Sequence, residues 1–342
     1  MPVPHQRDPE LTRERLRAWL PGGPAVGPVS IPGSGFSTET LIFEASWPDR
    51  DRRLVARVAG PGHRLYPQAR LDVEFQVMRV LGRGADVPVP AVHWYEDDPA
   101  ILGGPFFVMD HVDGRTPADL PSYHREGWVA DLPEKDRARL WWSGVETLRR
   151  IHSLDASDLA FADLPVTGPN RGASGLERQL DHYEEHLGFF DAEPALARDA
   201  LAWLREHRPP EPPAPSLLWG DARLGNMLFT ASGRPAAVLD WEMTSLGDPE
   251  SDLAWYLYLD RHLSEGIGAA RLPGLPDREE TVAGYEKSSG RPVRHLHYYE
   301  VFAGFRLMLI TARLTRLLRA NGTVGPGFPL ARNTAALLAR TL

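Results

Sequence analysis

Three polar side chains in the middle of the chain form the pattern with the clearest chemical meaning. Asp221 and Asn226 lie in the stretch Trp219–Asn226, and Asp240 ends the next apolar segment. Two carboxylates and a carboxamide are the groups that a magnesium-assisted phosphoryl transfer requires. One carboxylate accepts the proton of the attacking hydroxyl, and the other two side chains supply oxygen ligands for the metal.

A β-hairpin is expected to bring two of these residues together. The turn-forming segment Ala231–Pro235 separates two short apolar runs, which is typical of a hairpin. If the turn is centred on Gly233, antiparallel pairing places Asn226 opposite Asp240, with their Cα atoms roughly 5 Å apart. Asp221 would then lie on the loop that leads into the hairpin.

The elements that must position this hairpin fall into two regions. The first third of the chain contains short strand patterns and one helical pattern at Gln68–Gly82. From Arg137 onwards, long helical patterns dominate, and the last of them covers His295–Arg319. The sequence therefore predicts an α+β protein in which a small mixed region precedes a larger, mainly helical one.

The composition argues against several classes of protein. The 342 residues carry a formal charge of −8 and include no cysteine, which disfavours nucleic-acid binding and leaves no disulfide or thiolate metal site. The first 20 residues lack the apolar core of a signal peptide. The longest apolar run, Val301–Ile310, is interrupted by Arg306 and is too short to span a bilayer. We expect a cytoplasmic protein without nucleic-acid or membrane partners.

The spacing of the three polar residues resembles the catalytic and metal-binding loops of kinase-like folds. Residues 30–259 resemble the aminoglycoside phosphotransferase family of small-molecule kinases, in the branch that includes kinase domains attached to some acyl-CoA dehydrogenases. This resemblance implies a bilobal protein-kinase-like α+β fold. A nucleotide-binding lobe is expected at residues 1–109, a hinge at 110–114, and a catalytic and acceptor-binding lobe at 115–342.

The same resemblance implies roles for the central residues. Asp221 matches the catalytic aspartate, which orients the acceptor hydroxyl and takes its proton. Asn226 and Asp240 match the positions that hold Mg²⁺, and ATP, or alternatively GTP, would be the phosphoryl donor. Trp219, where the family commonly has histidine, and Asp252 would support the catalytic loop.

The first lobe is expected to hold the nucleotide. The only lysines, Lys135 and Lys287, lie outside it, so Arg57 takes the place of the usual strand lysine. Glu74 falls on the apolar face of its helix, where an ionised carboxylate needs a partner, and Arg57 is the expected one. The remaining contacts are expected from a turn over the phosphates and from the hinge at the adenine. These residues are Gly33, Ser34, Gly35, Phe36, Ser37, Met109, Asp110 and Val112.

The pattern leaves the acceptor open. Only about a dozen residues separate Asp240 from Asp252, too few for the peptide-docking segment of a protein kinase, so a small-molecule hydroxyl is expected and a protein substrate is not. A hydroxylated acyl compound and a non-catalytic nucleotide-binding regulator are the alternatives. Acidic residues would suit a polycationic aminoglycoside or form a solvated helix face, and aromatic residues would hold an apolar acceptor or pack in the core. The two sets are Asp181, Glu184 and Glu185, and Trp203, Tyr298, Tyr299 and Phe302.

Overall fold

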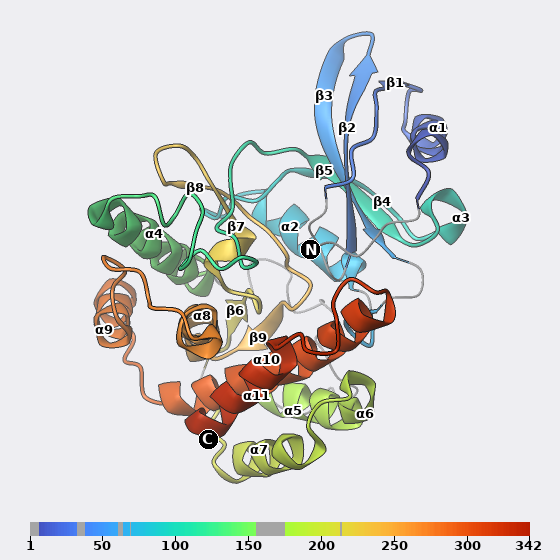
Figure 1. Cartoon of the computed structure of the whole chain (residues 1–342). Coiled ribbons are helices and arrows are strands. Elements are labelled where there is room, and N and C mark those ends of the chain that lie inside the picture. The colour runs from blue at the N-terminus through green and yellow to red at the C-terminus, as the bar shows by residue number, and fades with distance from the viewer. Residues whose placement is uncertain (1–6, 33–37, 61–63, 69, 155–174, 213) are drawn as a thin grey trace.

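A five-stranded antiparallel sheet forms the N-terminal part of the molecule, in the order β1-β2-β3-β5-β4 (Figure 1). The computed structural model describes the chain except residues 1–6, 33–37, 61–63, 69, 155–174 and 213. The strands of this sheet are β1 (Ala25–Val26), β2 (Thr38–Trp47), β3 (Arg50–Ala59), β4 (Val92–Glu96) and β5 (Phe106–Asp110).

Strand β3 has a hydrophobic core on each of its faces. Leu54, Ala56 and Val58 pack in a cluster that includes residues of helix α1 (Pro9–Trp19) and of the short helix α3 (Pro99–Leu102). The alternate residues of β3 face the other cluster, which contains the apolar side of helix α2 (Leu71–Leu81). Because side chains alternate along a strand, Arg57 is directed to the α2 face of the sheet.

Helix α2 buries a carboxylate along with its apolar residues. The sequence pattern predicted a helix at Gln68–Gly82, and the structure starts it at Leu71. Glu74 is only 2% exposed and lies among buried residues such as Met78. Arg57 and Glu74 are therefore directed toward each other from the sheet and from the helix that covers it.

The rest of the chain is mainly helical, as expected, and its short strands form two small sheets. Strand β6 (Ser216–Leu218) pairs with β9 (Ser245–Gly247), and β7 (Met227–Phe229) pairs with β8 (Pro235–Val238). The helices are α4 (Glu134–His152), α5 (Gly175–Glu185), α6 (Leu187–Phe190), α7 (Pro194–Glu206), α8 (Glu250–Leu263), α9 (Arg278–Ser289), α10 (Leu296–Ala320) and α11 (Leu330–Thr341), with short 3₁₀ turns at Leu224–Asn226 and Glu265–Ile267.

Helices α8 and α10 form the centre of the helical region (Figure 1). Every residue of α8 except Arg261 is buried, and α10 packs against α8 along one side and α11 along another. Nineteen of the 25 residues of α10 are buried, which explains why its sequence is apolar over most of its length. Across the described ranges of the chain, no helix combines the length and apolarity needed to cross a membrane.

His262, near the end of α8, gives the fold a pH dependence that can be measured. It is 4% exposed, and burial lowers the pKa of its imidazole to about 4. The unfolded chain binds this proton near pH 6.5, so folding stability is lost as the pH falls from about 6.5 toward 4. The full pKa difference corresponds to at most about 3 kcal/mol.

We expect the wild-type protein to lose more unfolding free energy than His262→Gln when the pH is lowered from 7 to 4.5. Urea unfolding of both proteins at both pH values measures the difference. Equal losses in the two proteins would contradict the assignment of a buried neutral histidine at this position.

Candidate active site

The hairpin formed by β7 and β8 is present, but its register differs from the prediction. Asn226 faces Leu239, whose N–H donates to the Asn226 carbonyl oxygen at 2.9 Å. Asp240 follows with a positive φ of 57°, outside the extended conformation of a strand. The prediction that Asn226 faces Asp240 was therefore wrong by one residue. The hairpin is centred one residue earlier than predicted, because Phe229 pairs with Pro235 around Ser232. The shift in register between Leu228 and Phe229 then moves the partner of Asn226 from Val238 to Leu239.

Asp221 lies on the loop that leads into this hairpin, and its carboxylate is held by three donors. One oxygen, Oδ1, accepts a hydrogen bond from the Trp255 indole at 2.8 Å. The other oxygen accepts from Asn226 Nδ2 at 2.6 Å and from Arg223 Nε at 3.1 Å. The side chain keeps 17% of its surface exposed. It is thus oriented by the protein and still open to a small molecule.

The backbone before Asp221 is fixed by a buried carboxylate on α8. Asp252 is 1% exposed and accepts the N–H groups of Trp219 at 2.7 Å and Gly220 at 2.9 Å. Gly220 has a φ of +89°, and a Cβ at this position would lie 2.1 Å from the carbonyl oxygen of Met243, so only glycine fits. The Trp219 indole donates to the Leu239 carbonyl at 2.8 Å, which ties the loop to the hairpin.

Arg57 joins the N-terminal sheet to the hairpin. Its Nη2 lies 2.5 Å from Asp240 Oδ1 and 3.4 Å from Glu74 Oε1. Burial opposes the charge of Arg57, but the carboxylates of Asp240, Glu74 and Glu242 outweigh it and hold the pKa of the guanidinium above its usual value. Burial raises the pKa of Glu74 to about 7, against the opposing effect of Arg57. The structure thus brings together Arg57, Glu74 and a predicted metal ligand.

The predicted hinge residues lie at the end of β5. Met109 is 7% exposed and packs in the core that α2 shares, and Val112 follows the strand. The Asp110 carboxylate accepts a hydrogen bond from Arg52 at 3.1 Å and lies 2.7 Å from His93 Nε2, so this side chain is held by neighbours in the sheet. The predicted turn, Gly33–Ser37, lies outside the described residues.

Arg223 was overlooked in the sequence, although it is the only cation in the loop between Asp221 and Asn226. It pairs with Asp119 as well as with Asp221. Burial opposes its charge, but these two carboxylates and Asp240 hold the pKa of the guanidinium above its usual value. Its sequence signal was a positively charged residue two positions after the proposed proton acceptor Asp221.

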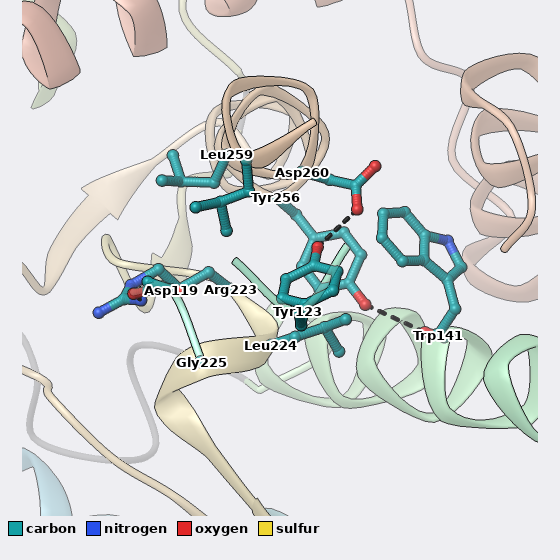
Figure 2. Close-up of a pocket in the computed structure, with 10 residues that line it drawn as sticks. Asp119, Tyr123, Trp141, Arg223, Leu224, Gly225, Tyr256, Leu259 and Asp260 are labelled. Carbon is teal, nitrogen blue, oxygen red and sulfur yellow. Dashed lines mark hydrogen bonds and ion pairs between the residues drawn. The ribbon is translucent and has the colours of Figure 1, made fainter. Parts of the chain in front are cut away.

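A small pocket lies beside Arg223 (Figure 2). Residues of the loop form one side, and residues of α4 and α8 form the other. Its polar lining is largely occupied by internal contacts: the Tyr123 hydroxyl donates to Asp260, and the Tyr256 hydroxyl donates to the Trp141 carbonyl. The two tyrosine hydroxyls of the lining thus already have partners among the other lining residues.

Comparison with known proteins decides the family of the chain. Residues 29–287 match the model of the phosphotransferase enzyme family. The chain belongs to this family. It is a phosphotransferase that acts on an alcohol group, and the family predicted from the spacing of the three polar residues is confirmed.

Curated relatives of this phosphotransferase carry the names of acyl-CoA dehydrogenases. "Probable acyl-CoA dehydrogenase IBR3" of Arabidopsis thaliana is 30% identical over 339 residues, which are 92% of this chain and 39% of the plant protein. Human "Acyl-CoA dehydrogenase family member 11" is 32% identical over 243 residues, which are 69% of this chain and 30% of the human protein. The chain thus spans two fifths or less of the length of these two relatives.

Solved structures confirm the kinase-like bilobal fold of the phosphotransferase. A "putative aminoglycoside phosphotransferase" from Ralstonia eutropha superimposes with a TM-score of 0.69 at 25% identity, over 98% of both chains. The aminoglycoside phosphotransferase APH(4)-Ia, in a ternary complex with AMP-PNP and hygromycin B, gives a TM-score of 0.62 at 16% identity, over 96% of this chain and 97% of that one. At this identity the second structure shows the fold alone.

The two sets of residues considered for acceptor binding are largely used within the phosphotransferase itself. Asp181 and Glu184 each lie 2.6 Å from Arg205 of α7, which neutralises much of the acidic face on α5. The aromatic residues Tyr298, Tyr299 and Phe302 are 5% exposed or less and pack in the core, and Trp203 stacks on Tyr298. Among the described residues, two of the three acidic side chains are thus paired with a cation, and most of the aromatic set belongs to the core.

The donor groups of the phosphotransferase fit a magnesium ion. Asn226 is 2% exposed and donates its Nδ2 to Asp221, which leaves its side-chain oxygen as an available ligand. Asp240 keeps 28% of its side chain exposed. Mg²⁺ usually takes one or two protein oxygens and fills its shell with phosphates and water. Within the described part of the chain, no cluster of three or more His, Cys, Asp or Glu side chains is arranged to hold a metal by itself.

Proposed function

We propose that the chain transfers the γ-phosphoryl group of ATP to a hydroxyl group of a small molecule and requires Mg²⁺. The observation that carries this proposal is the carboxylate of Asp221, which is oriented by three donors and still partly exposed beside Asn226. The aminoglycoside phosphotransferase structures with AMP-PNP or ADP hold a nucleotide in the same fold, which supports ATP as the donor here. GTP is the alternative donor.

In this mechanism Asp221 is the proton acceptor. A bond forms between the acceptor oxygen and the γ-phosphorus, the bond from that phosphorus to the bridging oxygen breaks, and ADP leaves. The hydroxyl proton passes to the Asp221 carboxylate. Because Asn226 and Arg223 hold one oxygen and Trp255 holds the other, the carboxylate stays aimed during the transfer.

The proposed phosphate site lies between Arg57 and the hairpin. Arg57 Nε is buried without a hydrogen-bond partner within the described ranges, and such a donor is costly unless a ligand satisfies it. A phosphate oxygen would supply that partner. Mg²⁺ held by Asn226 and Asp240 would neutralise the negative charge that the phosphates carry.

The same proposal assigns the remaining nucleotide contacts and the lobes. The backbone of Asp110 and Val112 would hold the adenine, with Met109 behind it, and the turn Gly33–Ser37 would cover the phosphates. Residues 1–109 would form the nucleotide-binding lobe, 110–114 the hinge, and 115–342 the acceptor-binding lobe. Asp252 and Trp219 would support the catalytic loop through their contacts with its backbone and with the hairpin.

A hydroxylated acyl compound is the second candidate acceptor beside an aminoglycoside. Two observations favour it. Arg205 neutralises the carboxylates that would attract a polycation, and the curated relatives are named as acyl-CoA dehydrogenases. The association of this phosphotransferase region with such proteins supports an acceptor from acyl metabolism.

ATP binding with Mg²⁺ and with EDTA, followed by a screen for ADP release, tests the proposed function. We expect Mg²⁺ to raise the affinity for ATP at least about tenfold, because it neutralises the charges on phosphates and carboxylates. The screen compares aminoglycosides, macrolides and hydroxyacyl thioesters as acceptors. Binding of ATP that does not depend on Mg²⁺ would overturn the proposal.

A further inference from the structure

Arg306 is a buried cation in the middle of α10. Its residue is 3% exposed, and among the described residues no carboxylate lies within ion-pair distance of it. A buried charge is costly unless its environment compensates for the lost water. The arginine therefore needs other partners, and its contacts lead to the catalytic loop.

The guanidinium of Arg306 makes two hydrogen bonds to oxygen atoms and lies over two rings. Nη2 donates to the Gly220 carbonyl at 2.9 Å, and Nε donates to the Tyr183 hydroxyl at 3.2 Å. The guanidinium carbon lies 4.4 Å from the ring centroid of Trp255 and 5.4 Å from that of Phe302. Electron-rich ring faces attract a desolvated cation, so these contacts compensate for its burial.

The contact with Gly220 completes the attachment of the backbone before Asp221. The N–H of Gly220 donates to the buried carboxylate of Asp252 at 2.9 Å, and its carbonyl accepts from the buried guanidinium of Arg306 at 2.9 Å. Both are hydrogen bonds to charged groups, which are stronger than neutral ones. An anion on α8 and a cation on α10 thus fix this glycine from opposite ends.

The contact with Trp255 leads to the carboxylate itself. The indole of Trp255 presents its face to Arg306 and donates its N–H to Asp221 Oδ1 at 2.8 Å. One side chain of α10 therefore holds both the backbone that carries Asp221 and the ring that orients its carboxylate.

We infer that Arg306 is a positioning residue for Asp221, and this inference rests on the proposed role of Asp221 as proton acceptor. Arg306 acts through Gly220 and Trp255. Among the described residues it contacts neither Arg57 nor Asp240, which belong to the proposed nucleotide site. Loss of its contacts should therefore lower the rate of transfer and leave nucleotide affinity unchanged.

Kinetic measurements on Arg306→Met and Arg306→Lys test whether the rate of transfer falls while the affinity for the nucleotide stays the same. The probe is slow hydrolysis of Mg·ATP with water as acceptor, read as ADP release. We expect Arg306→Met to lower kcat about 10- to 100-fold, since small misplacement of a catalytic group costs about that much, with the ATP Kd unchanged within about twofold. Arg306→Lys should restore part of the rate, because it keeps the charge. In an Asp221→Asn background the Arg306→Met change should have no further effect.

Arg313→Met is the matched control. Arg313 lies on the same helix, is 8% exposed, donates to the Arg64 carbonyl at 3.0 Å and lies over the ring of Phe189. Its loss removes a comparable set of contacts without touching the catalytic loop. An equal loss of kcat in Arg313→Met and Arg306→Met would overturn the inference, because it would mean that general loosening of α10 is the cause.

A second measurement decides the inference without any enzymatic activity. The indole N–H resonance of Trp255 is assigned by its absence in Trp255→Phe, and its hydrogen exchange is followed in the folded protein. We expect Arg306→Met to accelerate this exchange at least about tenfold, since the ring loses the cation that holds its face, and Arg313→Met to leave it unchanged. Unchanged exchange in Arg306→Met would overturn the inference. Absence of ATP binding in the wild-type protein would instead overturn the proposed function.

Discussion

Replacing Asp221 by alanine is expected to lower the rate of phosphoryl transfer about a thousandfold and to leave ATP affinity within about threefold of the wild-type value. Removal of a general base typically costs 10²- to 10⁴-fold in rate. The affinity should persist because Asp221 bonds to Trp255, Asn226 and Arg223, while the proposed phosphate site is built on Arg57. Single-turnover ADP formation and titration calorimetry measure the two quantities separately.

Asp221→Asn is the companion variant for this prediction. It keeps an oxygen to accept from the Trp255 indole, but its amide places a donor against the donors of Asn226 or Arg223. It removes the base with little change in volume, so it should be as inactive as Asp221→Ala. A loss of ATP affinity greater than about thirtyfold in both variants would mean that Asp221 is a metal ligand and not the proton acceptor.

The fold was predictable where helices and strands carry regular apolar patterns. Helix α10 is bounded by clear changes in pattern, and the structure places each of its ends within one residue of the predicted range His295–Arg319. Helix α9 was missed because it buries only Thr281 and Tyr285, which gives it almost no apolar periodicity. Its capping box at Asp277 and Glu280 was the remaining sequence signal for its start.

A contact of the site was predictable from the sequence where a charged residue lies on an apolar helix face and therefore needs a partner of opposite charge. Glu74 on an apolar helix face needed a cation, and Arg57 is found 3.4 Å away. The closer contact of Arg57 with Asp240 joins residues 183 positions apart and depends on how the sheet meets the hairpin, which no local pattern specifies. The shift in register at Phe229 is likewise invisible in the turn sequence.

Arg306 shows how the same reasoning extends to a residue that the sequence analysis used only to argue against a membrane span. A charged side chain inside an apolar helical run is costly, so it indicates a specific partner in the folded protein. The sequence did not reveal that partner, because the carbonyl of Gly220 belongs to a loop 86 residues earlier in the chain. Tertiary structure was needed to connect the two.

Asp240→Asn is expected to abolish the Mg²⁺-dependent gain in ATP affinity, and phosphoryl transfer with it. Asp240 is the only anion of the proposed pair of metal ligands, so its neutralisation removes most of the attraction for the cation. Asparagine is the informative substitution because Asp240 has a φ of +57°, a conformation that asparagine tolerates and alanine does not. Calorimetric ATP titrations in Mg²⁺ and in EDTA measure the gain directly.

Asp181→Asn is the matched control, since Asp181 is 29% exposed and lies 2.6 Å from Arg205, close to the 28% exposure and 2.5 Å ion pair of Asp240 with Arg57. It should bind Mg·ATP as the wild-type protein does. Full retention of the Mg²⁺ effect in Asp240→Asn would remove Asp240 from the metal site.

The direction in which Asp240→Asn changes the ATP affinity in EDTA distinguishes the loss of a metal ligand from general damage to the fold. In the absence of Mg²⁺, Asp240 repels the phosphates and also occupies Arg57, which is the cation proposed to bind them. Asp240→Asn removes that negative charge, and Arg57 remains paired with Glu74 at 3.4 Å. The variant should therefore bind ATP in EDTA at least as tightly as the wild-type protein, while it binds more weakly in Mg²⁺. A misfolded variant would lose affinity under both conditions, so the crossing of the two affinities is the result that identifies Asp240 as a ligand of the metal.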